Sequence, residues 1–254
     1  GQEPSRKISV SATGDEKKTA SYRIVGTVVY PDRHFVGREE ELEAIRTHLS
    51  GGENKLFLVG MGGIGKSEIA RMYLKRHSGD YDVVLWLSFE ESLRRTFLSD
   101  AAVPIQGLSR ADYPEDSDEE YWKRKLRILK EIADERVLLV VDNFDVPDDP
   151  DLEEFTRGAY AVIFTTRCHQ DAGRLPEVEV LSVTNHSELL TMFRAEYTRG
   201  LNPSGEACVD EILEQLDGHP LSIRLVASAM QSRRISPEKM NELLKNGASV
   251  MAEQ

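Results

Sequence analysis

The sequence predicts an α/β fold in which a parallel β-sheet is covered by helices on both faces and followed by a small all-helical domain. Short apolar runs alternate with helix-length segments up to about residue 184, and strands that alternate with helices build parallel sheets. From Ser187 onward such runs stop, and four segments with helical spacing follow. We therefore expect a linker or tag over residues 1–30, a sheet domain over residues 31–184 and a helical domain over residues 185–254.

The expected strands are apolar and partly β-branched, as strands buried on both faces are. Apolar residues at helical spacing predict helices at residues 38–50 and 121–135 in the sheet domain and in four segments after Ser187. The strands are "KLFLVG", "DVVLWLSF", "VLLVVD", "YAVIFTT" and "VEVLSV", at residues 55–60, 82–89, 137–142, 160–166 and 178–183.

Composition limits the functions that this part of the chain can have. The 254 residues are 40% hydrophobic and 30% charged, without an apolar run near the roughly 18 residues of a membrane-spanning helix. Thirty-two basic against 44 acidic residues give a net charge of −12, which argues against a surface that binds nucleic acid. Two cysteines without metal-ligand spacing, and no secretory segment, favour the cytoplasm. We expect neither a membrane nor a nucleic acid as partner.

The strongest chemical signal is "GMGGIGKS", residues 60–67, which lies between a predicted strand and a predicted helix. This pattern and context are typical of a loop that cradles nucleotide phosphates. Glycines let the backbone N–H groups face the anion, as the helix amino terminus also does. Lys66 would neutralise the β- and γ-phosphates, and the Ser67 hydroxyl is a hard oxygen that suits Mg²⁺. The predicted nucleotide contacts here are Gly62, Gly63, Ile64, Gly65, Lys66, Ser67 and Glu68.

A partner for the metal is predicted in "VLLVVDNFD", residues 137–145. Its apolar strand would place Asp142 at the carboxyl edge of the sheet, where ligands of open α/β sheets bind, and Asp142 would then hold Mg²⁺ through a water. The next residue is Asn143, which cannot serve as a carboxylate base. It could still hydrogen-bond a water, and Asp145 is a weaker candidate for the missing acid.

Further segments indicate which class of nucleotide-binding proteins the sequence resembles. "FVGREEEL" precedes the phosphate loop, "VIFTTR" closes the strand after Asp142, and "GHPLSIRL" opens a helix in the helical part. Together with "GMGGIGKS" and "LLVVDNFD", this order resembles the NB-ARC branch of the signal-transduction ATPases with numerous domains, the STAND proteins, and in particular their bacterial members. The resemblance covers roughly residues 33 to 230 and depends on the whole set of motifs.

The resemblance implies roles for further residues. Phe35, Val36, Gly37 and Arg38 would line the adenine pocket, largely through their backbone. Arg167 of "TTR" would reach the γ-phosphate and so distinguish ATP from ADP. Pro220 of "GHP" would pack on the adenine and tie the helical domain to the nucleotide. With Lys66, Asp142 and Asn143, Arg167 completes the set of residues expected to act in hydrolysis.

The implied function is a molecular switch that binds ADP or ATP with Mg²⁺ and hydrolyses ATP slowly. Exchange of ADP for ATP would drive self-association in the full-length protein. The chain stops where relatives continue into a winged-helix domain and sensor repeats, so these and any effector domain are expected to be missing. Two alternatives stay open: a steadily turning-over ATPase of the motor or loader type, and a nucleotide-regulated transcriptional regulator whose DNA-binding domain is absent here.

Overall fold

The structure, a computed structural model, describes residues 22–26, 35–52, 54–169 and 175–252. Most of the predicted linker, residues 1–30, lies outside these ranges. The described residues divide into two compact units. The sheet unit comprises the described residues of Gly1–Pro31, Glu39–Gly60 and Lys66–Glu179. The helical unit comprises residues 35–38, the loop Met61–Gly65 and the described residues of Val180–Gln254.

The sheet unit contains a five-stranded sheet in the order β3-β5-β6-β2-β7, and every neighbouring pair is parallel. All five predicted strands are present. The last was predicted too long, because Val183 packs in the core of the helical unit instead of continuing the strand. The strands are β2 (Lys55–Val59), β3 (Val83–Ser88), β5 (Val137–Asp142), β6 (Ala161–Thr166) and β7 (Glu177–Glu179).

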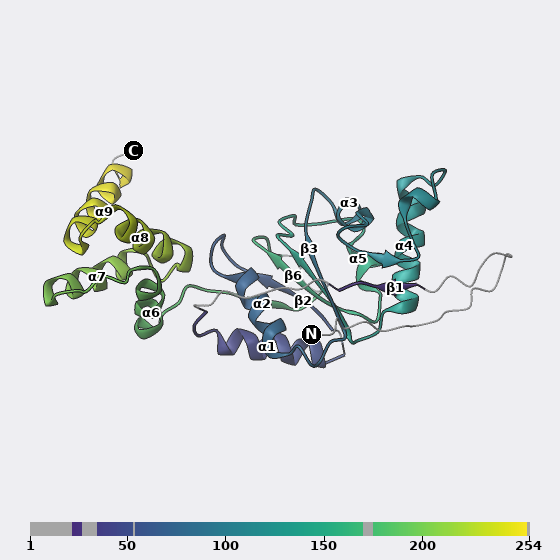
Figure 1. Ribbon diagram of the computed structural model, residues 1–254, viewed down its shortest axis with the longest axis horizontal. Coiled ribbons are helices and arrows are strands. Elements are labelled where there is room, and N and C mark those ends of the chain that lie inside the picture. The colour runs from purple at the N-terminus through teal and green to yellow at the C-terminus, as the bar shows by residue number, and fades with distance from the viewer. Residues whose placement is uncertain (1–21, 27–34, 53, 170–174, 253–254) are drawn as a thin grey trace. The chain divides into compact units, whose positions relative to one another are not determined.

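Both faces of this sheet are covered, as the apolar strands predict. Successive side chains of a strand point to opposite faces, and every residue of β2, β5 and β6 is buried. Phe57, Leu139 and Phe164 pack into one large core with the aromatic side chains of α3, α4 and α5. Helix α1 contacts β2, and helix α2 contacts β6. Figure 1 shows α1 and α2 on one side of the strands and α3, α4 and α5 on the other.

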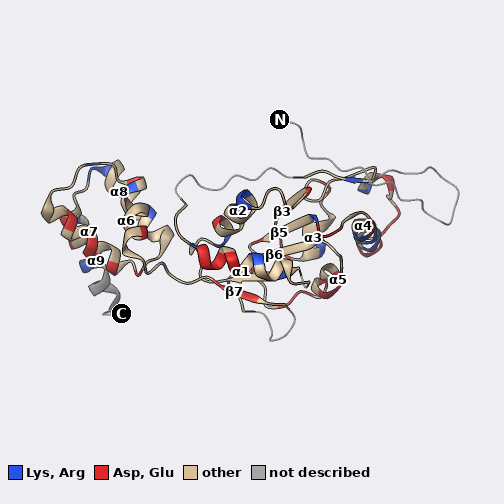
Figure 2. Cartoon of the chain, turned by 90° about the horizontal axis from the view of Figure 1, so that it is seen from below, with Lys and Arg blue, Asp and Glu red and all other residues tan. Residues whose placement is uncertain are grey.

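Local sequence explains how the helices of this unit begin. Helix α4 starts with a capping box, in which Ser117 and Glu120 satisfy each other's backbone N–H groups. The first turn of α1 carries three glutamates, which the positive end of the helix dipole favours (Figure 2). The helices are α1 (Glu39–Ser50), α2 (Lys66–Arg76), α3 (Leu93–Leu98), α4 (Asp118–Ile132) and α5 (Leu152–Thr156).

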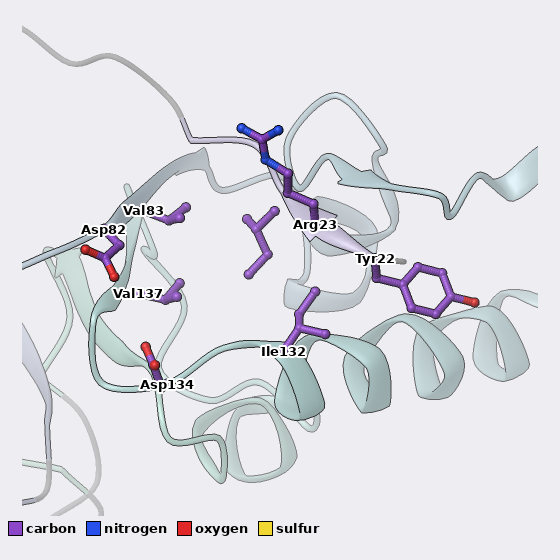
Figure 3. A pocket seen from close by; sticks show the side chains of 8 residues that line it. Tyr22, Arg23, Asp82, Val83, Ile132, Asp134 and Val137 are labelled. Atoms are coloured by element: carbon purple, nitrogen blue, oxygen red, sulfur yellow. The ribbon is translucent and has the colours of Figure 1, made fainter. Parts of the chain in front are cut away.

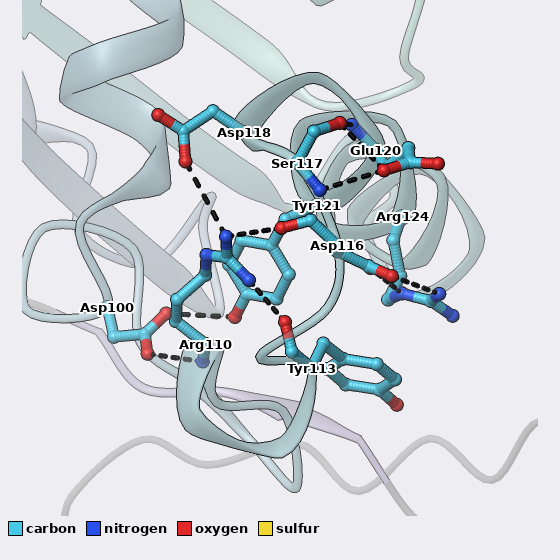
Figure 4. Close-up of polar contacts among 9 residues, drawn as sticks. All are labelled: Asp100, Arg110, Tyr113, Asp116, Ser117, Asp118, Glu120, Tyr121 and Arg124. Carbon is cyan, nitrogen blue, oxygen red and sulfur yellow. Dashed lines mark hydrogen bonds and ion pairs between the residues drawn. The ribbon is translucent and has the colours of Figure 1, made fainter.

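A network of polar contacts connects residues within the segment between β3 and β5 (Figure 4). The backbone N–H of Arg110, in the 3₁₀-helix η1 (Arg110–Asp112), donates to Asp100 at 2.9 Å. Lys125 of α4 is 0% exposed and donates to the same carboxylate at 3.2 Å. Burial raises the pKa of Asp100, but these two donors outweigh it, so that pKa lies below its ordinary value. The short strand β4 (Ile105–Gln106), which is part of this segment, pairs antiparallel with β1 (Arg23–Ile24).

The helical unit contains four helices around a core of its own, which the sequence predicted from the loss of strand runs after Ser187. Asn185 and Asn202 cap the first two helices, and Pro220 and Pro237 open the last two. No helix among the described residues is long and apolar enough to cross a membrane. The helices are α6 (His186–Glu196), α7 (Pro203–Gln215), α8 (Pro220–Arg233) and α9 (Pro237–Ala252).

Candidate functional site

Lys66 opens α2 at the carboxyl edge of the sheet. The residue is 8% exposed, and its ammonium donates to the carbonyl of Gly60 at 2.8 Å. The N–H of Gly60 donates to the carbonyl of Thr166 at 3.2 Å, which attaches the start of the loop to the end of β6. Burial lowers the pKa of Lys66, and the carboxylates of Asp145 and Asp142 oppose that effect. The lysine therefore occupies a desolvated place where a bound anion would be favourable.

Two hydroxyl groups meet at one oxygen of Asp142. Ser67 Oγ and Thr165 Oγ1 each donate to Oδ1 of Asp142 at 2.6 Å. Asp142 is 6% exposed at the end of β5, and Thr165 comes from the neighbouring strand β6. The structure thus brings the two predicted metal ligands, Ser67 and Asp142, into direct contact. Thr165 was not predicted, although it lies within the quoted segment "VIFTTR".

These oxygens fit Mg²⁺, which prefers carboxylate and hydroxyl ligands and usually keeps several waters. Within the described ranges, no group of three or more His, Cys, Asp or Glu side chains could enclose a metal ion. A cation at Ser67 and Asp142 would therefore complete its coordination with water and phosphate oxygens. This is the arrangement expected for a metal that arrives with a nucleotide.

Asn143 is exposed and has a left-handed backbone, with φ of 62°. Its N–H donates to Thr165 Oγ1 at 2.9 Å, and its carbonyl accepts from the N–H of Asp145 at 2.8 Å. Asparagine, aspartate and glycine are the residues that adopt this conformation most readily. The backbone at the end of β5 therefore explains a short polar residue here, and the side chain supplies an amide in place of an acid.

Arg167 and Asp145 form an ion pair at the same edge of the sheet. Nε of Arg167 donates to Oδ2 of Asp145 at 2.7 Å, and Nη2 lies 2.7 Å from the same oxygen. The backbone N–H of Arg167 donates to Oδ1, also at 2.7 Å. The hydrogen bond with Asp145 raises the pKa of Arg167, and both charges affect the pKa of Lys66. Asp145, the weaker candidate for a catalytic acid, thus has both oxygens engaged by Arg167.

In the helical unit, the loop Met61–Gly65 is held by the start of α8. Nε2 of His219 lies 2.8 Å from the carbonyl of Gly62, and the N–H of Leu221 donates to the carbonyl of Gly63 at 3.3 Å. Because Nδ1 of His219 accepts from the N–H of Ser222, the proton for the bond to Gly62 is on Nε2. His219 was not predicted, although it is the middle residue of "GHP".

The side chain of Arg38 forms a hydrogen bond with another residue of this loop. Its guanidinium donates to the carbonyl of Leu181 at 2.8 Å and to that of Ile64 at 3.1 Å. The preceding Gly37 has φ of 67°, and a Cβ there would lie 2.2 Å from a carboxylate oxygen of Glu188. The positive φ favours glycine at this position, and a side chain here would also displace the carboxylate of Glu188.

The remaining residues that we predict to contact the nucleotide lie within the described ranges, and their contacts with a nucleotide stay predictions. Phe35 and Val36 are partly buried, and Pro220 is the first residue of α8. Glu68 forms an ion pair with Arg71 one turn further along α2. Gly63 and Gly65 have φ of 77° and 107°, which agrees with the backbone freedom for which glycine is expected in such a loop.

Two hollows in the sheet unit lie at the opposite, amino-terminal edge of the strands. The smaller, about 20 Å³, adjoins the first residues of β3 and β5, Val83 and Val137 (Figure 3). The larger, about 620 Å³, adjoins Lys55 at the start of β2. Ligands of open parallel sheets bind at the carboxyl edge, so neither hollow is our candidate for a nucleotide site.

A strand, a glycine-rich loop, a Lys-Ser pair that opens a helix, and an acid that contacts the serine together define a P-loop nucleotide-binding site. Residues 34–159, just under half of the chain, match the family described as "AAA ATPase domain". This match supports a P-loop ATPase domain over that part of the chain. No curated protein is detectably similar in sequence.

Solved structures share the fold at low identity. The Walker-type ATPase PABY2304 of Pyrococcus abyssi is 15% identical with a TM-score of 0.58, over 89% of this chain and 77% of that one. The ORC1 protein of Aeropyrum pernix, solved with DNA, is 15% identical with a TM-score of 0.50, over 84% and 66%. Hsp104, solved with ATPγS and FITC-casein, is 16% identical with a TM-score of 0.51, over 83% and 42%. At these identities the likeness confirms the P-loop α/β fold alone.

Proposed function

We propose that this chain is the nucleotide-binding module of a molecular switch, in which exchange of ADP for ATP changes conformation and promotes self-association. The observation that carries the proposal is the contact of Ser67 and Asp142 at 2.6 Å next to the buried Lys66. This contact brings the ammonium that we propose for phosphate binding and the two proposed magnesium ligands to one edge of the sheet. Membership of the NB-ARC branch is part of the proposal and is supported by the order of the quoted motifs.

Each residue has a role that its surroundings allow. Lys66 would neutralise phosphate charge, since an anion restores the solvation that burial removes from its ammonium. Ser67 and Asp142 would hold Mg²⁺, which when bound would neutralise further phosphate charge. Arg167 would meet the γ-phosphate. Phe35, Val36, Gly37, Arg38 and Pro220 would line the adenine.

Slow hydrolysis is proposed because the neighbourhood of Asp142 offers little to polarise a water. Asn143 carries no charge, and Asp145 shares both its oxygens with Arg167. Because both oxygens of Asp145 already accept hydrogen bonds from Arg167, they are less free to accept a proton from an attacking water. The site therefore favours nucleotide retention over rapid turnover.

A steadily turning-over ATPase is the second candidate, and the match of residues 34–159 to an AAA ATPase domain favours it. The two candidate functions differ in the expected rate of ATP hydrolysis. Enzymes commonly turn over at roughly 1–10³ s⁻¹, and we expect single-turnover hydrolysis by this chain to be far slower. ADP released when the purified protein is denatured would support the switch, whereas a rate in the enzymatic range would support the alternative.

Calorimetric titration with ADP and ATP tests the phosphate-binding assignment. Lys66→Met should abolish or strongly weaken binding of both nucleotides while the fold is kept. Lys55→Met is a matched control, because Lys55 is also a buried lysine that donates to a carbonyl, that of Gly158, and its pKa is also lowered by burial. Equal affinities of Lys66→Met and wild type would refute the assignment.

A further inference from the structure

We propose that Asp145 is a specificity-determining residue, whose carboxylate competes with the γ-phosphate for Arg167 and so lowers the preference of the site for ATP over ADP. The inference rests on the proposed function, because it assigns Arg167 to the γ-phosphate. It concerns the regulation of that contact by a residue that binds no nucleotide itself.

The geometry of the pair is more specific than that of an ordinary surface ion pair. Three donor atoms of Arg167, two of the guanidinium and the backbone N–H, lie 2.7 Å from Asp145 oxygens. The Asp145 side chain is 22% exposed, whereas that of Arg167 is 61% exposed. The carboxylate is therefore the more buried partner, and the guanidinium is the partner that is more open to solvent.

Sequence position explains how the two residues meet. Asp145 follows the metal-ligand candidate Asp142 by three residues, and Arg167 follows β6 directly. Strands β5 and β6 are parallel neighbours, so their carboxyl ends lie together. The charges of both residues reach Lys66. The pair consequently lies within the electrostatic environment of the lysine assigned to the phosphates.

The charges determine the direction of the effect. When Arg167 is paired with Asp145, the positive charge available to a third phosphate is largely neutralised. A γ-phosphate that binds Arg167 would have to displace the Asp145 carboxylate from the guanidinium, so that one anion replaces another. ADP makes no such exchange, so the cost falls on ATP alone.

Replacement of the carboxylate by its isosteric amide tests the competition. Asp145→Asn keeps an oxygen that can accept from the Arg167 backbone N–H but removes the negative charge. We expect the ratio of ATP affinity to ADP affinity to rise roughly twofold to fivefold, about the strength of one partly exposed charge interaction. Calorimetric titration with each nucleotide, at saturating Mg²⁺, measures the ratio.

A double-mutant cycle shows whether the effect passes through Arg167. In the Arg167→Ala background, Asp145→Asn should leave the ratio unchanged; an equal rise there would overturn the competition in favour of direct repulsion. Glu153→Gln is a matched control, since Glu153 forms an exposed ion pair with Arg157 elsewhere in the sheet unit, and it should leave the ratio unchanged. The proposal is also overturned if Asp145→Asn binds ADP normally with the wild-type ratio. Failure of wild type to bind either nucleotide would instead refute the proposed function itself.

Discussion

Thr165 offers a sharp test of the geometry around Asp142. Its buried hydroxyl donates to Oδ1 of Asp142 at 2.6 Å and accepts from the N–H of Asn143 at 2.9 Å. Thr165→Val keeps the branched shape at Cβ but removes both hydrogen bonds. A hydrogen bond to a charged group contributes about 1.5–3 kcal/mol, and a partly buried N–H without a partner costs about 1 kcal/mol. We expect the free energy of unfolding to fall by about 2.5–4 kcal/mol.

Urea denaturation followed by tryptophan fluorescence measures this loss, in the absence of nucleotide and Mg²⁺. Both tryptophans, Trp86 and Trp122, lie in the sheet unit, so the signal reports the unit that contains Thr165. Thr165→Ser retains the hydroxyl and should lose much less stability than Thr165→Val. If the serine variant is as unstable as the valine variant, the methyl group and not the hydroxyl stabilises this site, and the reasoning is wrong.

Three further predictions follow from other parts of the chain. Asn143→Asp should raise single-turnover ATP hydrolysis at saturating Mg²⁺ and Asp142→Ala should abolish its Mg²⁺-dependent part; rapid wild-type hydrolysis that Asn143→Asp leaves unchanged would contradict the role of the amide. His219→Ala should weaken nucleotide affinity about fivefold, the value of one neutral hydrogen bond, with His219→Gln less affected in the same titration. Asp100→Asn should lower the free energy of unfolding by about 1–3 kcal/mol at pH 7, since buried Lys125 loses its charged partner. Because the pKa of Asp100 is depressed in the folded state, its contribution is present above the unfolded value of about 3.9 and is lost as pH falls through the folded value. Denaturation curves of Asp100→Asn and wild type should therefore converge at low pH, and a constant difference would contradict the assignment.

Much of the candidate site was predictable because its signals are local in sequence. The P-loop pattern places Lys66 and Ser67 at the start of a helix, and an apolar run of strand length places Asp142 at the end of a strand. These predictions depend on periodicity and on residue type over a few positions. The contact between Ser67 and Asp142 then follows from the carboxyl ends of parallel strands meeting at one edge.

Contacts that depend on strand order were not predictable in the same way. Thr165 reaches Asp142, and Arg167 reaches Asp145, because β6 lies next to β5 in the sheet. His219 and Gly62 are separated by 157 residues. No local pattern encodes such partners.

The sequence by itself therefore determined the α/β class, the five strands, and the residue types suited to phosphate and Mg²⁺, since each depends on short-range spacing. Only the tertiary structure decided that Val183 ends the last strand early by joining the helical core. It also decided that Asp145, two residues after Asn143, is paired with Arg167. Both outcomes result from packing and charge pairing between distant segments, whose free energies are set by the whole fold and not by neighbours in the chain.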